Sequence, residues 1–464
     1  MRQSWTFLLI GALPVAAQEA LRLEDVLRSV EANYPPLLAA LADRDIADAD
    51  ILQALGRFDT VVGVQFDTDQ LGYYANERVT FGFNQPFAQW GASAYGGWRV
   101  GEGRFAPYDG KSETRSLGEW RGGVTLPLLR NRTIDERRGN LDKARIGRRI
   151  ADLGVGLQRL VVRQLASRRY WDWASAGMRL RIAREALRVA EERDAAIRET
   201  ARLGQIAAVE VTENRRQILQ RRAQLVEADR AVQASAIELS LFYRDSSGRP
   251  VLPAAAQLPD RLPDTAGLPE EEVQEGLRRA LAQRPEILRL AEQKRQTEVD
   301  IRLARNDRLP AVDVGLGFTA EGGDNAAVRR GPSEVKASLR FELPFQRRAA
   351  DGRLRGALAR IAQIEQRERF ARDQVEAEVR DAASAVRAAH ERALLAREET
   401  AVAADLAGAE RERFRLGDST LFTVNLREQA AVEAELREVS AVNEYLRALT
   451  LYEQVTMDAT VSGS

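Results

Sequence analysis

The chain has 464 residues, with 69 basic and 69 acidic side chains, a formal net charge of zero, one histidine and no cysteine. The missing cysteines exclude disulfide scaffolds, iron–sulfur sites and cysteine nucleophiles, and the single His390 argues against multi-histidine metal centres and histidine-based triads. The balanced, interspersed charges argue against a nucleic-acid partner held by a net basic field. We therefore expect no catalytic residue, no metal and no cofactor.

The first residues have the layout of a secretory signal peptide. A cationic Met1-Arg2 start, an apolar core from Trp5 to Leu13 and the small residues Val15-Ala16-Ala17 predict cleavage after Ala17. No cysteine follows, so we expect no lipid anchor. The remainder lacks a run of about 18 apolar residues, which excludes a helical membrane protein but leaves open a closed β-barrel.

The rest of the sequence reads as two copies of one unit. Three pairs of segments recur in order: Tyr34-Pro35 with Arg284-Pro285, Leu126-Pro127-Leu128 with Leu343-Pro344-Phe345, and Arg202-Leu203-Gly204 with Arg415-Leu416-Gly417. This order predicts an internal duplication. The predicted division is a signal peptide at 1–17, a first repeat at 18–249, a Pro-rich linker at 250–269, a second repeat at 270–457 and a tail at 458–464.

Each copy is predicted to contain a helix of about 35 to 40 residues, a β segment, a helix of about 70 residues, a tight turn and a helix of about 40. Apolar residues in the first long helix follow a heptad pattern, at Ile146, Ile150, Leu153, Leu157 and Leu160. Such a helix would be about 105 Å long and needs lateral partners. Its periodicity fits a cylinder wall and also a solvent-exposed rod or dimeric coiled coil.

The β segment of the second copy, about 311–345, alternates between apolar and hydrophilic residues over two runs of about ten. This length and alternation predict transmembrane barrel strands. The residues predicted to face lipid are Val312, Val314, Leu316, Phe318, Val335, Leu339 and Phe341. Those predicted to face the barrel lumen are Lys336, Ser338, Arg340 and Glu342.

The β segment of the first copy, about 59–128, is longer. It alternates at Val62, Val64 and Phe66 and again around Trp120, and between these runs it holds an aromatic stretch that fits either an interfacial girdle or an added hairpin. An ordinary antiparallel sheet covering a helix remains the alternative. Two strands per copy would give four per chain, too few to close a barrel, so we expect the chain to associate.

Together, the duplicated landmarks resemble the TolC-type outer-membrane efflux channel family over essentially the whole mature chain. The resemblance implies an α+β fold: an all-antiparallel transmembrane β-barrel contributed by three chains, twelve strands in all, continued by a long α-helical coiled-coil barrel. It also implies a non-enzymatic homotrimer in outer-membrane lipid. Its periplasmic end would bind a periplasmic adaptor protein, and through it an inner-membrane pump.

The resemblance also assigns the two inner tips. The turns at Arg202, Leu203 and Gly204 and at Arg415, Leu416 and Gly417 would form the periplasmic end and dock the adaptor. Family members often carry an aspartate six residues beyond each tip glycine. Glu210 stands there in the first copy and Thr423 in the second, so Glu210 and the nearby Asp418 are the candidate acidic gate.

The function expected is therefore a passive export duct in a tripartite efflux or type I secretion system. A pore-less periplasmic coiled-coil structural protein and a stand-alone porin remain alternatives. Strand alternation favours a pore over a rod, and about 100 Å of helix favours a periplasm-spanning duct over a porin.

Overall fold

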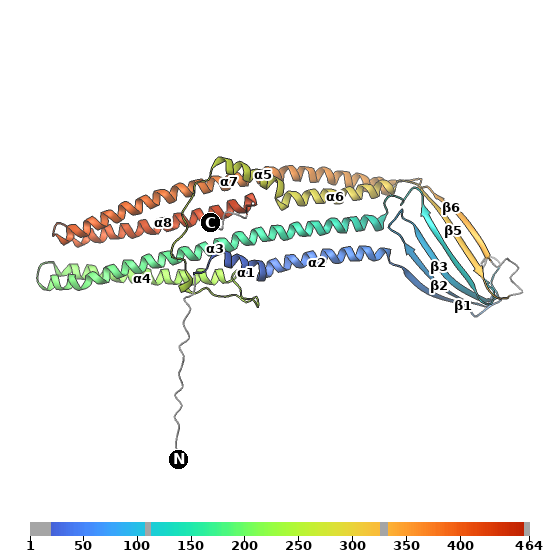
Figure 1. Ribbon diagram of the computed structural model, residues 1–464, viewed down its shortest axis with the longest axis horizontal. Coiled ribbons are helices and arrows are strands. Elements are labelled where there is room, and N and C mark those ends of the chain that lie inside the picture. The colour runs from blue at the N-terminus through green and yellow to red at the C-terminus, as the bar shows by residue number, and fades with distance from the viewer. Residues whose placement is uncertain (1–19, 107–112, 325–332, 459–464) are drawn as a thin grey trace, which may run out of the picture. The chain divides into compact units, whose positions relative to one another are not determined.

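The computed structural model describes residues 20–106, 113–324 and 333–458. The signal-peptide prediction therefore lies outside the described residues. The fold is mixed α and β, with long helices and an antiparallel sheet (Figure 1). The first half contains α1 (Leu23–Asn33), α2 (Pro35–Leu55), β1 (Val61–Asp69), β2 (Asn76–Pro86), β3 (Ser93–Gly103), β4 (Glu119–Pro127), α3 (Glu136–Arg202) and α4 (Ala208–Ser240).

The second half follows a similar order. It contains α5 (Glu270–Gln283), α6 (Pro285–Asn306), β5 (Ala311–Glu321), β6 (Ser333–Glu342), α7 (Arg348–Arg415) and α8 (Leu421–Thr456). The long helices α3 and α7 have 67 and 68 residues, which confirms the predicted length of about 70.

The first helix expected in each half is in fact two helices. The helices break at Tyr34-Pro35 and at Arg284-Pro285, where Tyr34 and Arg284 have extended backbone with ψ of 116° and 128°. A proline ring disfavours the helical conformation of the preceding residue, so each Pro starts a new helix instead of continuing the old one. The prediction of a single helix of 35 to 40 residues was wrong for this reason.

The described residues fall into two compact units, each built from both halves of the sequence. Among the described residues, the first unit draws on 20–39, Gly156–Arg284 and 372–458, and the second on those within Ala40–Val155 and Pro285–Ala371. The first unit is helical, and the second holds the sheet.

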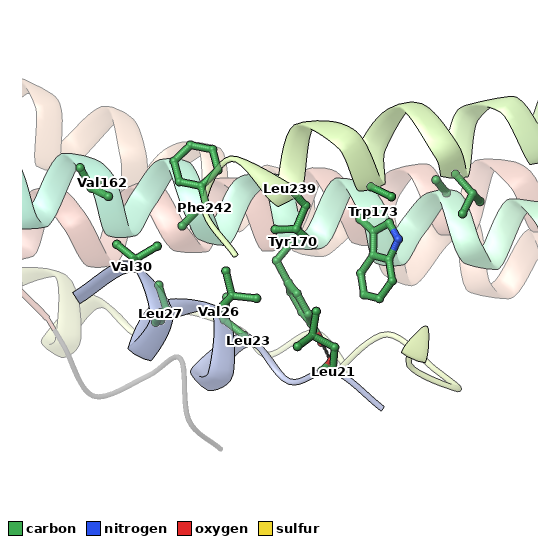
Figure 2. Packing of buried hydrophobic residues seen from close by; sticks show 14 of the residues in the cluster. Leu21, Leu23, Val26, Leu27, Val30, Val162, Tyr170, Trp173, Leu239 and Phe242 are labelled. Atoms are coloured by element: carbon green, nitrogen blue, oxygen red, sulfur yellow. Dashed lines mark hydrogen bonds between the residues drawn. The ribbon is translucent and has the colours of Figure 1, made fainter. Parts of the chain in front are cut away.

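The core of the first unit forms where α1 packs on α3 and on the end of α4 (Figure 2). Val26 and Val30 lie on one face of α1 because they are four residues apart, and both are buried. Trp173 on α3 is completely buried, and the Tyr170 hydroxyl donates a hydrogen bond to the Leu21 carbonyl at 2.9 Å. Tyr170 and Trp173 therefore serve the packing of the helices.

The second unit contains one six-stranded antiparallel sheet in the order β1-β2-β3-β4-β5-β6 (Figure 1). The prediction of two strands in the first copy, and so four per chain, was therefore wrong. The aromatic stretch between the two expected strands forms β2 and β3, a hairpin inserted between β1 and β4. Val79, Phe81 and Phe83 alternate along β2 as the flanking strands do, so the hairpin has the pattern of a strand pair with two different faces.

Ion pairs join the helices of the second unit. Three pairs link α3 to α6: Lys143 to Asp300 at 3.1 Å, Arg149 to Glu292 at 2.9 Å, and Arg302 to Asp142 at 3.2 Å. Part of the balanced charge of the chain is therefore used between neighbouring helices.

Candidate functional site

The sheet has one apolar and one polar face, because residues directly opposite in an antiparallel register share a face. Along β5 and β6, Val312 pairs with Phe341, Val314 with Leu339 and Phe318 with Val335. The same register places Gly315 opposite Ser338 and Asp313 opposite Arg340. The seven residues predicted to contact lipid thus lie on one face, and Lys336, Ser338, Arg340 and Glu342 lie on the other.

The apolar face continues across all six strands. Val64 on β1 lies opposite Phe81 on β2, Phe81 opposite Trp98 on β3, and Trp98 opposite Trp120 on β4. Its large side chains are exposed: Val64 is 71% exposed, and other exposed members are Val62, Phe66, Phe81, Phe83, Trp120, Val124, Leu316, Phe318, Val335, Leu339 and Phe341. An exposed apolar surface of this extent is typical of contact with lipid or with a protein partner.

A second candidate site consists of the two helix tips, α3 to α4 and α7 to α8. Gly204 and Gly417 have φ of 73° and 89°, a conformation that glycine adopts without steric cost. The Gln205 amide donates to the Thr200 carbonyl and the Asp418 amide to the Arg413 carbonyl, at 3.1 and 2.9 Å. Both tips therefore close with the same Schellman-type turn.

Both tip arginines are held by a glutamate one helical turn earlier. Arg202 Nη2 donates to Glu199 Oε1 at 2.6 Å, and Arg415 Nη2 donates to Glu412 Oε1 at 2.5 Å. The hydrogen bonds from these guanidinium groups hold the pKa of Glu199 and of Glu412 below its usual range. The repeated Glu-x-x-Arg-Leu-Gly sequence, of which only Arg-Leu-Gly was recognised as a motif, therefore defines each tip.

Each tip also exposes two apolar side chains. Leu203 and Val209 are 56% and 67% exposed at the first tip, and Leu416 and Phe422 are 63% and 66% exposed at the second. Val209 and Phe422 occupy equivalent positions, five residues after the tip glycine. Neither residue is among those predicted from the sequence, although their shared spacing from the glycines is a usable signal.

The candidate gate residues lie at separate tips. Glu210 is half-buried in the first turn of α4, and Asp418 is exposed in the turn before α8. A further acid at the second tip is Glu410, which is 8% exposed and accepts a hydrogen bond from Ser419. The structure thus adds Glu410 to Asp418, the one acid predicted at this tip.

Replacing a tip glycine by alanine is expected to destabilise that turn by about 1 kcal/mol, because the Cβ of alanine makes a positive φ sterically unfavourable. Hydrogen exchange of the tip amides in Gly417→Ala would measure this loss. Gly408→Ala is the matched control: Gly408 lies within α7, with space for a Cβ, and alanine there favours the helix. Equal effects from both variants would contradict the turn argument.

A buried polar layer joins α3, α4 and α8 near the tips. Glu428 on α8 accepts hydrogen bonds from Arg193 of α3 at 3.0 and 3.1 Å and from Arg221 of α4 at 3.1 Å. Arg193 also donates to Asn425 at 2.9 Å, and Arg221 donates to the Ala186 carbonyl at 2.6 Å. Glu428 and Arg221 are 7% and 6% exposed, so one buried carboxylate holds two cations from two other helices.

Another buried acid, Glu453, lies near the end of α8. Burial raises the pKa of Glu453 to about 7; Asp458 adds to the rise, and Arg163 opposes it. The folded chain therefore favours the neutral carboxyl at this position.

The free energy of unfolding should fall as pH rises through this range. The unfolded carboxyl titrates near 4.5, so between about pH 4.5 and 7 the folded state binds more protons than the unfolded state. The loss is roughly 3 kcal/mol once Glu453 is fully ionised. Urea unfolding at pH 5 and pH 8 should show this slope in the wild type and a smaller one in Glu453→Gln. Glu433→Gln, which changes an exposed acid on the same helix, should keep the wild-type slope.

Within residues 20–106, 113–324 and 333–458, no helix combines the length and apolar character needed to cross a membrane. The same described residues contain no group of three acidic or histidine side chains that could hold a metal ion.

Solved structures share this fold. The open-state MtrE outer membrane channel of Neisseria gonorrhoeae matches at 15% identity and a TM-score of 0.67, covering 94% of this chain and 88% of that chain. The outer membrane protein VceC of Vibrio cholerae matches at 14% identity and a TM-score of 0.65, covering 94% and 95%. A membrane protein from Pseudomonas aeruginosa matches at 17% identity and a TM-score of 0.63, covering 97% and 99%.

A protein family also matches part of the sequence. No curated protein matches the chain. The family described as "Outer membrane efflux protein" matches residues 276–453, which include both predicted strands of the second half, α7 and most of α8. Members of this family are outer-membrane transport ducts that extend into the periplasm and are not enzymes. The resemblance drawn from the duplicated landmarks is therefore confirmed, with the outer membrane efflux protein family matching the second half of the chain.

Proposed function

We propose that three copies of this chain form a passive duct in the outer membrane, which receives cargo from an inner-membrane pump through a periplasmic adaptor. The observation that carries this proposal is the sheet with its exposed apolar face and its opposite polar face. In lipid, backbone groups at a sheet edge must be paired, so a sheet with two outer strands, β1 and β6, requires other copies to close it.

The helices supply the second part of the duct. At 1.5 Å per residue, α3 and α7 are each about 100 Å long, which suits a passage across the periplasm. The matching tips, each with an ordered arginine and two exposed apolar side chains, are suited to docking an adaptor. An apolar centre with an ordered charge beside it is a common composition of a protein interface.

The test is whether the purified full chain is a trimer that conducts. We expect a heat-resistant trimer from outer-membrane fractions that forms ion channels in planar bilayers. The trimer should also co-purify with an adaptor, and the double variant Leu203→Ser with Leu416→Ser should abolish this co-purification. A trimer that conducts but binds no adaptor would support a stand-alone porin. A helical oligomer that never conducts would support a structural coiled coil.

We further propose that Glu210 and Asp418 form an acidic constriction at the tips. Carboxylates from three copies would concentrate cations at the entrance, because a cleft lined by one sign of charge focuses the field. Glu210→Ala with Asp418→Ala should lower cation selectivity and weaken block by multivalent cations in single-channel recordings. Unchanged conductance and block would remove these acids from the gate. Glu399→Ala on α7 serves as a control, because it removes an exposed acid far from the tips in sequence.

A further inference from the structure

We infer that the β2–β3 hairpin forms two additional wall strands, so that three copies close a barrel of eighteen strands instead of twelve. This inference rests on the proposed trimeric duct and specifies its width. Barrel diameter grows roughly linearly with strand number, so the section would be about 1.5 times as wide as a twelve-stranded one. Barrels of 16 to 18 strands leave a water-filled channel. The outer section would therefore admit bulky hydrated cargo.

The hairpin is paired as a full member of the sheet. β2 pairs with β1 over nine residues and with β3 over eleven, and β3 pairs with β4 over seven. Its apolar residues Phe81 and Trp98 share the face of Val64 and Trp120, so the exposed apolar surface crosses the hairpin without interruption. A hairpin folded over the sheet or into the lumen would not continue this face.

The turn between β2 and β3 packs against the chain that connects β4 to α3, as expected for a hairpin within the barrel wall. A Cβ atom on Gly91, in this turn, would overlap the Asn131 carbonyl oxygen between β4 and α3, so the turn packs closely there. The connections between β3 and β4 and between β5 and β6 are longer in sequence, and the strand ends that they join lie at the opposite end of the sheet. Short turns at one end and longer loops at the other are typical of outer-membrane barrels.

The rows of paired residues run obliquely across the strands, as the closure of a barrel requires. One row of paired residues begins at Gly63, the third residue of β1, and passes through Gly82, Gly97, Arg121 and Thr319. It ends at Glu334, the second residue of β6, which starts at the opposite end of the sheet. Strands tilted against their hydrogen-bonding rows are a geometric condition of a closed barrel.

The polar face leaves room for solute. Many of its positions lack a side chain: Gly63, Gly82, Gly97, Gly101, Gly123, Gly315 and Gly317. The Tyr95 side chain covers two of these glycines, because a Cβ on Gly123 or Gly317 would overlap the Tyr95 hydroxyl. At these glycine positions no side chain fills the added width, while the charged side chains between them, such as Lys336 and Arg340, keep the face hydrated.

Disulfide mapping tests the wall directly, because the chain has no cysteine of its own. In the assembled protein oxidised with iodine, Val64→Cys should cross-link to Phe81→Cys on β2. It should not cross-link to a cysteine at Trp120, Gly122 or Val124 on β4. If Val64→Cys bonds to β4 in a conducting trimer, the hairpin lies outside the wall and the inference is wrong, while the duct stands. If no trimer or channel forms at all, the proposed function itself fails.

Polymer access measures the width. Ser338→Cys, on the polar face of β6, would be labelled from the cell exterior with maleimide polymers of increasing mass. Because coil size grows roughly as the square root of length, the wild-type barrel should admit polymers about twice as heavy as a variant lacking residues 76–103. An equal cut-off in two trimeric, conducting proteins would overturn the inference. If the deletion variant does not assemble, the disulfide map decides alone.

Discussion

Glu428→Gln should loosen α8 from α3 and α4 more than any other single charge removal near the tips. The substitution keeps the size of the side chain but leaves the buried Arg221 and the partly buried Arg193 without this counter-charge. Removing one partner of a buried ion pair costs about 3–5 kcal/mol, because the remaining charge stays desolvated. Hydrogen exchange of α8 amides around Glu428 should show a loss of opening free energy of about this size.

The matched control is Glu399→Gln. Glu399 accepts two hydrogen bonds from Arg437, at 3.2 and 2.8 Å, and like Glu428 it joins two helices, but both members of the pair are about half exposed. An exposed pair contributes little, so the exchange rates should stay near wild type. If the two variants behave alike, burial does not govern the strength of the Glu428 contact.

A triple variant separates charge from packing. With Glu428→Leu, Arg193→Leu and Arg221→Leu together, no charge remains unpaired, and stability should recover most of the loss or exceed wild type. In the proposed duct, Glu428→Gln should also raise conductance, since it frees the tip end of α8 from α3 and α4. If hydrogen exchange of α8 becomes faster in Glu428→Gln but the conductance does not rise, Glu428 stabilises the fold and has no part in gating.

Leu339→Arg is expected to prevent stable insertion of the sheet into the outer membrane. Leu339 is 71% exposed on the apolar face, where a cation in lipid costs about 2–4 kcal/mol at the bilayer midplane and proportionally more in a trimer with three copies. The amount of heat-resistant trimer in outer-membrane fractions should fall sharply, with the chain recovered as unassembled protein.

Ser338→Arg is the control, because it places the same cation one residue away on the opposite face. It should assemble normally and change only the ion selectivity. If Ser338→Arg were lost and Leu339→Arg inserted, the faces would be reversed and the lipid and lumen assignments wrong. If both assembled, the apolar face would contact protein or water instead of lipid.

The residues that sequence analysis placed correctly are those governed by local rules. Strand alternation at Val312 to Phe318 predicted one face of β5 because side chains of a strand alternate by geometry alone. The tip glycines were found because Arg-Leu-Gly recurs in both halves, and a helix that reverses within a few residues favours a left-handed glycine there. The long helices followed from their heptad periodicity.

The residues that it missed depend on partners distant in sequence. Glu428 is one of many glutamates, and its importance arises only because Arg193 and Arg221, more than 200 residues away, are packed against it. The hairpin was ambiguous because aromatic alternation fits both a girdle and a strand pair. Pairing with β1 and β4 decided between them, since a strand is stabilised by its neighbours and not by its own sequence.

The sequence by itself thus determined the resemblance to outer-membrane efflux channels, the two helix tips and the two-faced strands, because spacing and alternation can be read along the chain. Only the tertiary structure decided how many strands form the sheet, which carboxylate holds the helices near the tips, and which acid titrates near neutral pH. These features depend on burial and on contacts between distant segments. The six strands of the sheet are the clearest case, because their number sets the proposed width of the duct.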